Sequence, residues 1–381
     1  MKIAYCVKNV SHIGGIPKVL AMKANALTEI YHHEIYILES DHGKSLPESA
    51  VFSPRIKIID LNINYDQMAS DSAWKMLKER MHKRNLHKRR LYEYLNLIEP
   101  DIVISMGWEE KFFLPSIVGR WKTVREFHLT TNMRTILYGR QSFQNLVVAK
   151  IADFYEFKCR ARRFDKIVVL TEEDKAAHWR YNKKVCVIPN PQTFHSETVS
   201  NLMNKTLIAV GRLEPQKNYA SLIRAFSIAN TTYSDWKLEI YGEGPDREKL
   251  QRLIDDLNLS ERVMLHGNTK HVKDVMLKAS CFVLSSKWEG MPLVMIEAMT
   301  CGLPIVSYDC PCGPKDLITD GVNGFLVRMG DEREFALKMM AVMEHKALRD
   351  RLGAAAKAKS EQYNLHTIMG QWQHLFEDLT A

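Results

Sequence analysis

The 381-residue chain is longer than one ordinary hydrophobic core, and its composition, 46% hydrophobic and 26% charged, is that of a globular protein of two domains. Seven cysteines with a single close pair, Cys310 and Cys312, argue against a disulfide framework or a metal site, and no apolar run approaches the roughly 20 residues of a membrane span. Residues 1–195 carry 31 Lys and Arg against 21 Asp and Glu, a net charge of +10, whereas the remainder carries −2, so we expect the first half to meet a large anionic partner.

The chain begins directly with an apolar strand, Lys2–Val7, and has no signal-peptide layout, so we expect a cytoplasmic protein. Gly14 and Gly15 separate this strand from an amphipathic helix that runs from Ile16 to about Ile30. Paired glycines let backbone N–H groups approach an anionic ligand closely. The G-x-G-x-x-G spacing of a dinucleotide site is absent from this loop.

Further strand-like runs follow at Glu34–Leu38, Ile56–Leu61, Asp101–Met106, Thr123–Phe127, Lys166–Leu170 and Val185–Ile188. Helical patterns separate most of these runs, which predicts an α/β domain with a parallel, doubly wound sheet. Ligands of such sheets bind beyond the carboxyl ends of the strands. His128 directly follows one strand and is therefore a candidate site residue; the alternative is a structural histidine with satisfied hydrogen bonds.

A basic amphipathic helix is predicted around Trp74–Tyr92, with eight Lys and Arg between Lys75 and Arg90. Such a helix can lie on an anionic membrane, where each basic side chain near the surface adds about 1 kcal/mol. The candidate membrane or acceptor face consists of Lys83, Arg84, Lys88, Arg89 and Arg90, and the cluster Lys158 to Arg163 is a candidate for the same face. The alternative is a solvated helix that packs by its apolar stripe onto the sheet. No nucleic-acid-binding module is recognised, so no nucleic-acid partner is expected.

A domain of residues 1–192 and a polar linker, 193–204, precede a second domain of residues 205–365. This domain restarts with a strand, Thr206–Val210, and the loop after it carries Arg212 and Lys217 at the ligand edge of the predicted sheet. A diphosphate needs both a planar fork of donors and a point charge, which Arg and Lys supply. Trp236–Tyr241 and Arg262–Leu265 are the next strands.

A buried strand at Cys281–Leu284 leads through a loop punctuated by Gly290 and Pro292 into a short helix, Leu293–Met299. This geometry points a helix N-terminus at an anion. Glu289 lies in the loop and Glu297 about one turn into the helix, so the two carboxylates are expected to face one polyhydroxylated ligand from two heights. Helices from Glu332 onward complete the chain.

Glu289 and Glu297, with seven residues between them, resemble the E-x7-E motif of retaining glycosyltransferases of family 4, which have the GT-B fold. The loop of Arg212 and Lys217 is similar to the family's diphosphate-binding loop. The Cys-Pro-Cys-Gly-Pro-Lys stretch that ends at Lys315 resembles transferases of bacterial surface polysaccharides and lipid-linked oligosaccharides. The resemblance covers residues 205–330 with several motifs, and residues 1–190 with little more than their layout.

The resemblance implies an α/β GT-B architecture of two Rossmann-like domains facing a cleft. The first would bind the acceptor and the second the nucleotide sugar, with residues 366–381 a helix that crosses back to the first. It implies donor contacts from the residues Gly14, Gly15, Asn268, Thr269, Gly290, Met291, Pro292, Leu293 and Glu297. In the catalytic set that it implies, Arg212 and Lys217 stabilise the diphosphate, Glu289 binds the donor sugar, and His128 positions the reacting sugars. The chain contains no Asp-x-Asp, so no metal or other cofactor is expected.

The expected activity is the transfer, with retention, of a hexose or N-acetylhexosamine from a nucleotide sugar, with UDP favoured. The expected acceptor is a lipid-linked glycan or surface polysaccharide at the inner face of the cell membrane, where the protein would be peripheral. One alternative is another GT-B enzyme, such as a sugar-nucleotide epimerase or hydrolase. A catalytically silent scaffold is the other.

Overall fold

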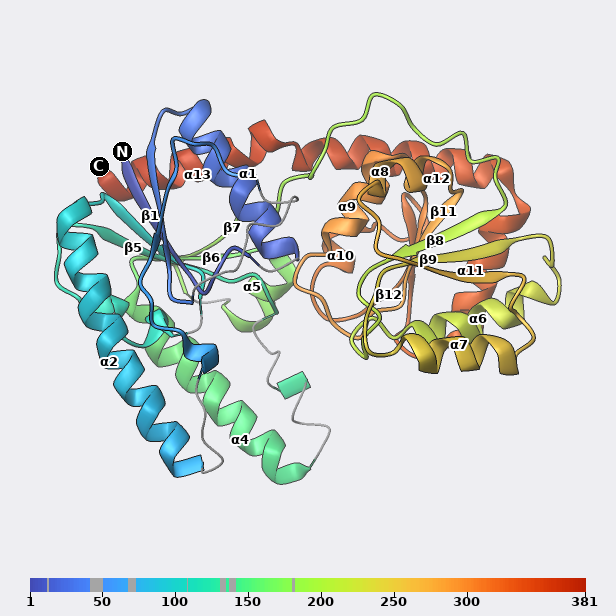
Figure 1. Cartoon of the computed structure of the whole chain (residues 1–381). Helices are drawn as coiled ribbons and strands as arrows, with labels where there is room; N and C mark the ends of the chain where they lie inside the picture. The colour runs from blue at the N-terminus through green and yellow to red at the C-terminus, as the bar shows by residue number, and fades with distance from the viewer. Residues whose placement is uncertain are drawn as a thin grey trace. The chain divides into compact units, whose positions relative to one another are not determined.

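The computed structural model describes residues 1–11, 14–41, 51–67, 73–107, 109–130, 135–136, 142–179 and 182–381, apart from the side chain of Lys158. The described chain packs as two compact units. Unit 1 consists of Met1–Pro189 together with His366–Ala381, and unit 2 is Asn190–Leu365. Figure 1 shows helices on both faces of the sheet in each unit.

Unit 1 is built on a seven-stranded sheet in the order β3-β2-β1-β4-β5-β6-β7, and every pairing is parallel. Its strands are β1 Lys2–Val7, β2 Glu34–Glu39, β3 Lys57–Asp60, β4 Ile102–Ser105, β5 Lys122–Glu126, β6 Lys166–Val169 and β7 Val185–Val187. The strand order reverses direction between β1 and β4. The central strands are buried on both faces, which explains why they appear in the sequence as continuous apolar runs.

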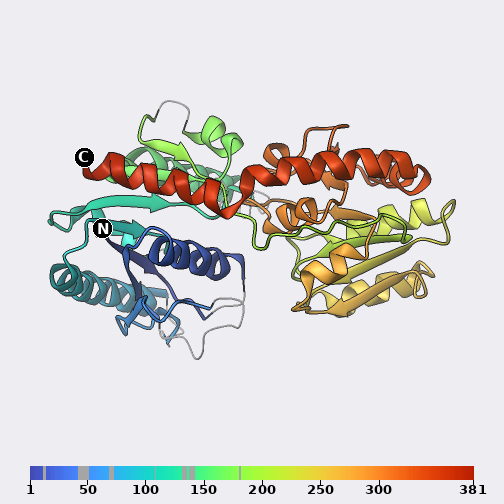
Figure 2. The ribbon, with the colours of Figure 1, turned by 90° about the horizontal axis from the view of Figure 1, so that it is seen from above.

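The described helices of unit 1 are α1 Gly15–Glu29, α2 Ala73–Ile98, α4 Phe143–Phe154, α5 Glu172–His178 and α13 Leu365–Thr380. Short helical turns are η1 Tyr65–Gln67, η2 Glu110–Phe112, η3 Leu114–Ser116, η4 Tyr155–Arg160 and η5 Ala161–Arg163. Figures 1 and 2 show α13, in red, running along the rest of unit 1. Its Trp372 ring covers the ammonium group of Lys23 on α1, with 3.7 Å between Nζ and the ring centre.

Unit 2 is built on a six-stranded parallel sheet in the order β10-β9-β8-β11-β12-β13. Its strands are β8 Thr206–Val210, β9 Lys237–Tyr241, β10 Val263–Gly267, β11 Cys281–Leu284, β12 Ile305–Tyr308 and β13 Gly324–Val327. Its helices are α6 Tyr219–Asn230, α7 Arg247–Asp256, α8 Val272–Leu277, α9 Leu293–Thr300, α10 Pro314–Leu317, α11 Glu332–Glu344, α12 Lys346–Ser360 and η6 Glu361–Tyr363. Here the strand order reverses between β8 and β11.

The parallel, doubly wound sheet predicted from the sequence is confirmed in both units, with strand ends that differ by one or two residues. The apolar stripe expected along α2 differs from the observed packing. Only its second half is buried, through His87, Leu91, Leu95 and Ile98. In the first turns Trp74 is 69% exposed, because that part of α2 extends past the sheet (Figure 1). Among the described residues, no helix is both long enough and apolar enough to cross a membrane.

Candidate functional site

The candidate site of unit 2 lies at the carboxyl ends of β8 and β11, the two strands between which the strand order reverses. Loops that leave neighbouring parallel strands in opposite directions open a crevice at such a point, and ligands of open α/β sheets bind there. Three loops meet at this edge. They are the β8–α6 loop of residues 211–218, the β11–α9 loop of residues 285–292, and the β12–α10 loop of residues 309–313.

The β8–α6 loop is held against the turn after β9 by close backbone packing. The Gly211 N–H donates to the Tyr241 carbonyl and the Leu213 N–H to the Glu243 carbonyl, each at 2.9 Å. A Cβ at Gly242 would lie 1.9 Å from the Gly211 carbonyl oxygen, and φ there is +150°. Only glycine therefore allows the two backbones to approach so closely, and this contact sets the path of the loop that carries Arg212.

Arg212 and Lys217 occupy different environments on this loop. The Arg212 side chain is 71% exposed, and its guanidinium lies 3.4 Å from the Glu214 carboxylate. Lys217 is largely buried, and its Nζ donates to Glu289 Oε1 at 2.7 Å. The structure thus brings together two residues that the sequence analysis assigned to different parts of the ligand. Arg212 remains accessible to a ligand, whereas Lys217 is already held in place by Glu289.

Backbone and side-chain hydrogen bonds join the three loops. Gln216 donates from Nε2 to the Trp288 carbonyl at 2.9 Å, and the backbone carbonyl of Gln216 accepts from the Lys287 N–H at 2.8 Å. Ser285 Oγ donates to the Lys217 carbonyl at 2.7 Å. The Glu289 N–H donates to the Pro311 carbonyl at 3.1 Å, which ties in the third loop.

The first turn of α9 is prepared for an anion. No side chain in the described part of the chain caps the helix, and its first turn contains no acidic residue that would neutralise its N–H groups. Pro292 precedes the helix in an extended conformation. Gly313, at φ +103°, fits beneath it, because a Cβ there would lie 2.6 Å from Pro292 Cδ. Met291 is buried, and its sulfur accepts the Asn190 N–H at 3.3 Å, while Gly290 and Leu293 continue the same turn.

Glu297 is buried within α9, and its Oε1 accepts a hydrogen bond from Thr193 Oγ1 at 2.5 Å. Sequence analysis missed Thr193, which belongs to the segment assigned to a linker, and no local pattern indicates a contact between residues 104 positions apart. Asn268 and Thr269 follow β10. Thr269 Oγ1 accepts the His271 N–H at 3.0 Å, and no hydrogen bond or ion pair between described residues joins Asn268 or Thr269 to Lys217 or Glu289.

Three buried polar atoms on the same loops have no hydrogen-bond partner among the described residues: Ser286 Oγ, Trp288 Nε1 and Asp309 Oδ1. Buried polar atoms are normally satisfied, so unpaired ones at a strand edge are available to a ligand. Sequence analysis did not select these residues. For Asp309 alone the sequence carried a usable signal, because it is a polar residue placed directly after the fully buried strand β12.

Unit 1 contributes a second group of predicted residues. The Cβ position of Gly14 has no atom of another described residue within 4 Å, and it lies at the N-terminus of α1, whose first residue is Gly15. The His128 side chain is only 5% exposed, and its Nε2 lies 3.1 Å from Glu126 Oε1. Glu126 Oε1 also accepts from Lys23 Nζ at 2.5 Å. Burial raises the pKa of Glu126, but the charges of Lys23 and His128 outweigh it and lower that pKa to about 2.

The five cations proposed for a membrane or acceptor face on α2 do not form one free face. Lys83 donates to the Asn64 carbonyl at 2.6 Å, and Arg84 pairs with Glu109 at 2.8 Å. Arg90 donates to the Leu61 and Asn62 carbonyls at 2.6 and 2.7 Å. Lys88 and Arg89 are exposed, and among the described residues the Arg89 side chain forms one ion pair, with Glu93 at 3.8 Å.

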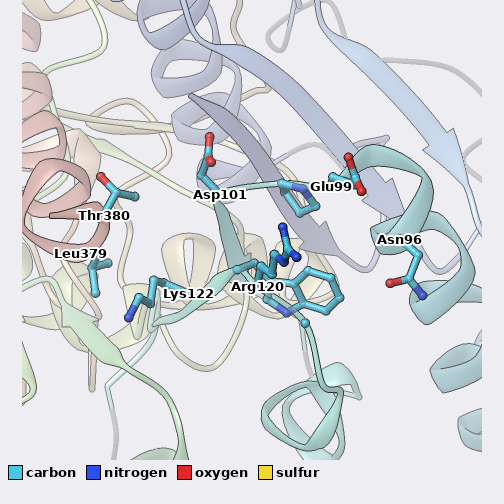
Figure 3. Close-up of a pocket in the computed structure, with 10 residues that line it drawn as sticks. Asn96, Glu99, Asp101, Arg120, Lys122, Leu379 and Thr380 are labelled. Atoms are coloured by element: carbon cyan, nitrogen blue, oxygen red, sulfur yellow. The ribbon is translucent and has the colours of Figure 1, made fainter.

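A further hollow of unit 1, about 610 Å³ in volume, lies at the amino ends of β4 and β5, the edge opposite Gly14 and His128. Figure 3 shows Arg120 there with the carboxylates of Glu99 and Asp101 around it, and Lys122 on the side where Leu379 and Thr380 lie. None of the predicted site residues lines this hollow. In the described part of the chain, no three His, Cys, Asp or Glu side chains gather as metal ligands.

Residues 191–359 match the family model described as "Glycosyl transferases group 1". An uncharacterized glycosyltransferase of Haemophilus influenzae is 32% identical over 249 residues, which cover 64% of this chain and 69% of that protein. An α-1,4-N-acetyl-D-galactosaminyltransferase of Campylobacter jejuni, named for a diphospho-undecaprenol-linked glycan, is 25% identical over 100% of this chain and 99% of its own. A Streptomyces coelicolor exopolysaccharide phosphotransferase is 34% identical over 231 residues, but the chain covers only 24% of it.

The structure resembles solved structures over nearly its whole length. A mutant form of Staphylococcus aureus TarM, in complex with Fondaparinux, alpha-GlcNAc-glycerol and UDP, superposes with a TM-score of 0.75 at 16% identity, covering 98% of this chain and 99% of that chain. At this identity the likeness shows the fold.

Proposed function

Because the chain belongs to the glycosyltransferases, carries a group 1 domain over residues 191–359 and has the GT-B fold, we propose that it transfers a hexose or N-acetylhexosamine from a nucleotide sugar to a glycan acceptor. We propose a UDP-linked donor, as in the UDP complex of TarM. We propose a lipid-linked or surface-polysaccharide acceptor, in line with the acceptor named for the Campylobacter relative. Membership of family 4 and retention of the anomeric configuration are parts of the same proposal.

The observation that supports this proposal most strongly is that three loops meet around Lys217 and Glu289, at the point in unit 2 where the strand order reverses. Breaking the anomeric bond leaves negative charge on the diphosphate. Preorganised positive groups that meet this charge lower the barrier, and Arg212, Lys217 and the N-terminus of α9 supply such groups. Glu289 holds the Lys217 ammonium in a fixed orientation and keeps its second oxygen for a sugar hydroxyl.

Glu297 is assigned to the ribose, because its carboxylate can accept from two neighbouring hydroxyl groups. Thr193 then positions Glu297 through the hydrogen bond to Oε1. Asn268 and Thr269 are assigned to the base, and the roles of Gly14, Gly15 and His128 remain predictions. Since Arg212 and Lys217 neutralise the leaving group, we propose that the reaction needs no metal ion, and we assign no covalent nucleophile.

The test is incubation of the purified protein with UDP- and GDP-linked hexoses and N-acetylhexosamines, with and without membrane extract that contains lipid-linked glycans. We expect nucleoside diphosphate release that requires the extract and persists in EDTA. Release without any acceptor would instead identify a hydrolase, and a changed sugar on the donor an epimerase. The absence of turnover and of calorimetric nucleotide binding would identify a scaffold. Activity that is lost in EDTA and restored by manganese would contradict metal independence.

The same proposal places the protein at the inner face of the cell membrane as a peripheral protein. The net charge of +10 on residues 1–195 and the exposed Lys88 and Arg89 suit an anionic surface. A lipid-linked acceptor would bring the enzyme to that surface. Sedimentation with vesicles that contain phosphatidylglycerol tests this location, and failure to bind them would refute it.

A further inference from the structure

Helix α4 exposes its large apolar side chains apart from Leu146, which is half-buried. We call the exposed set the α4 face, and its members are Phe143, Val147, Val148, Ile151, Phe154 and, one residue past the helix, Tyr155. Their exposed fractions range from 40% for Val147 to 78% for Phe143. The side of α4 that faces unit 1 carries Ala149 and Asp153, both buried. A surface helix normally shows the opposite arrangement.

The side chains of the α4 face lie on one side of the helix. At about 100° per residue, they fall within an arc of about 140° around the helix, which also contains the exposed polar side chain of Gln144 in the first turn. The polar residues Asn145 and Lys150 lie outside this arc. Soluble proteins seldom expose a contiguous apolar patch of this kind unless it serves an interaction.

The charged side chains exposed in the segment that carries the α4 face are positive. Between residues 142 and 163 the two carboxylates, Asp153 and Glu156, are buried. Lys150, Arg162 and Arg163 are exposed, and we call these three cations the cationic border. Among its described side chains, this segment therefore exposes cations and no anion.

The first turns of α2 repeat this combination. Trp74, Leu77 and Met81 are 69%, 50% and 56% exposed, and they alternate with the exposed cations Lys75 and Lys78. An aromatic or aliphatic side chain next to a cation suits the boundary between lipid headgroups and hydrocarbon.

Helix α2 and the end of α4 are linked through one ring. The Phe112 ring lies between two guanidinium groups, 3.9 Å from Arg84 on α2 and 4.0 Å from Arg160 on η4, which directly continues α4. Figure 1 shows both helices running toward the same end of unit 1, with their first turns beyond the sheet. The two exposed apolar surfaces therefore belong to one end of the unit.

We propose that the α4 face inserts into the hydrocarbon boundary of an anionic lipid bilayer, with the first turns of α2 beside it. The cationic border favours a surface of anionic lipid. A second copy of this chain is disfavoured, because a two-fold contact would bring the cations of both copies close together. The inference rests on the proposed function in one respect, because a lipid-linked acceptor gives the insertion its purpose. Insertion of the apolar side chains adds binding free energy that salt does not screen, in addition to the electrostatic attraction.

The first test replaces Val147, Ile151 and Phe154 by Ser together and measures binding to vesicles of phosphatidylcholine and phosphatidylglycerol. We expect binding at high salt to weaken at least about 100-fold, since each inserted aliphatic or aromatic side chain contributes tenfold or more. The matched control, Ile228→Ser with Leu337→Ser, removes two exposed apolar side chains from unit 2 and should bind as the wild type does. The substituted side chains are exposed, so circular dichroism should be unchanged in both variants.

A second test leaves the α4 face intact. Cys159, the exposed cysteine just past this face, is labelled with an environment-sensitive fluorophore in a Cys186→Ser background. We expect a blue shift with anionic vesicles and quenching by lipids that carry a spin label on the upper acyl chain. Quenching only by a headgroup label would overturn insertion.

Two further results would overturn the proposal. One is wild-type vesicle binding by the triple Ser variant. The other is a wild-type dimer that the same variant converts to a monomer in sedimentation velocity, which would make the α4 face an interface between copies. Neither assay contains donor or acceptor, so an inactive wild type would refute the proposed function and still leave this test decisive.

Discussion

At the scale of single residues, the contact between Lys217 and Glu289 changes the interpretation of both. A lysine assigned to the diphosphate and a carboxylate assigned to the sugar share one hydrogen bond of 2.7 Å, and both side chains are mostly buried. A charge held by a partner in a mostly buried setting needs little reorganisation when a ligand arrives. Arg212, which is 71% exposed, has to be ordered by the ligand itself.

The single variants Lys217→Ala and Arg212→Ala should each have a kcat lowered by roughly 10²–10³-fold, the range for loss of one charge-stabilising donor. The measurement is initial-rate kinetics with the nucleotide sugar identified by the panel. Lys205→Ala is the control, because Lys205 also forms an ion pair, with Asp235, but immediately precedes β8, at the opposite edge of the sheet. Near wild-type rates in the Lys217 and Arg212 variants would remove both residues from the site.

Glu126 should contribute stability that depends on pH. Its folded-state pKa of about 2 lies below the ordinary 4.5, so the ionised carboxylate stabilises the fold above about pH 4.5, and this contribution is lost as the pH falls toward 2. At pH 7 Glu126→Gln should destabilise unit 1 by about 3–5 kcal/mol, because Lys23 keeps its buried charge without a partner.

The measurement is hydrogen exchange of β5 peptides across a urea series at pH 7 and at pH 3. The difference in the free energy of unfolding between the wild type and Glu126→Gln should be smaller at pH 3 than at pH 7. Asp235→Asn serves as the control, since its ion pair with Lys205 is exposed and contributes little. A stability difference that is the same at both pH values would show that the charge of the Glu126 carboxylate does not cause it.

At the scale of elements, glycines decide how closely the loops of unit 2 approach. Gly242 admits the backbone of the loop that carries Arg212, and Gly313 admits Pro292 at the start of α9. Both loops end at the same edge of the sheet, so a side chain at either glycine would push a ligand-binding segment away from its neighbour. The site is assembled by backbone contacts as much as by charged side chains.

Gly313→Ala should weaken nucleoside diphosphate binding by at least about tenfold, because the new methyl group displaces Pro292 and the first turn of α9. Gly330→Ala is the control for the effect of backbone strain alone. Gly330 also has a positive φ, +87°, but no atom of a described residue lies within 4 Å of its Cβ position. It should cost about 1–2 kcal/mol of stability and leave affinity unchanged in calorimetry. Equal affinity in both variants would refute the displacement.

On helix α2, Lys88→Gln with Arg89→Gln should weaken binding to anionic vesicles by about 30-fold at low salt, at about 1 kcal/mol for each exposed cation. The effect should fade as salt is added. Lys249→Gln with Arg252→Gln, on exposed positions of α7 in unit 2, is the matched control. Equal vesicle binding by the α2 variant and this control would make Lys88 and Arg89 ordinary solvated residues.

At the scale of the whole molecule, unit 1 is completed by the end of the chain. Helix α13 returns the segment from His366 onward to unit 1, where Trp372 covers Lys23 and Gln373 bonds to His33 at 2.7 Å. Lys23 thus lies between a carboxylate on β5 and an aromatic ring from the last helix. The packed core of unit 1 therefore contains residues from both ends of the sequence.

Trp372→Ala should destabilise unit 1 by about 3–5 kcal/mol, because a fully buried ring is lost and Lys23 loses its cover. Hydrogen exchange should accelerate in α1 and β1 and stay unchanged in β8 and β11. Phe335→Ala, at a buried position of unit 2, should give the reverse pattern. Loss of protection across both units in either variant would mean that the units do not unfold separately.

The sequence by itself determined the fold class and the position of nearly every strand. A buried parallel strand is a continuous apolar run, and the Gly and Pro signals at its ends are local, so both can be recognised without knowing the neighbours. The loop of Arg212 and Lys217 and the segment from Glu289 to Glu297 were selected on the same local grounds, and their roles remain predictions.

Only the tertiary structure decided which of these residues meet. Thr193 reaches Glu297 across 104 positions and Lys23 reaches Glu126 across 103, contacts that depend on which strand edges the fold brings together. It also decided that Lys83, Arg84 and Arg90 bond to unit 1 itself, and that the large apolar side chains of α4 face outward. Periodicity shows which residues share a face of a helix, but whether that face is covered depends on the surrounding structure.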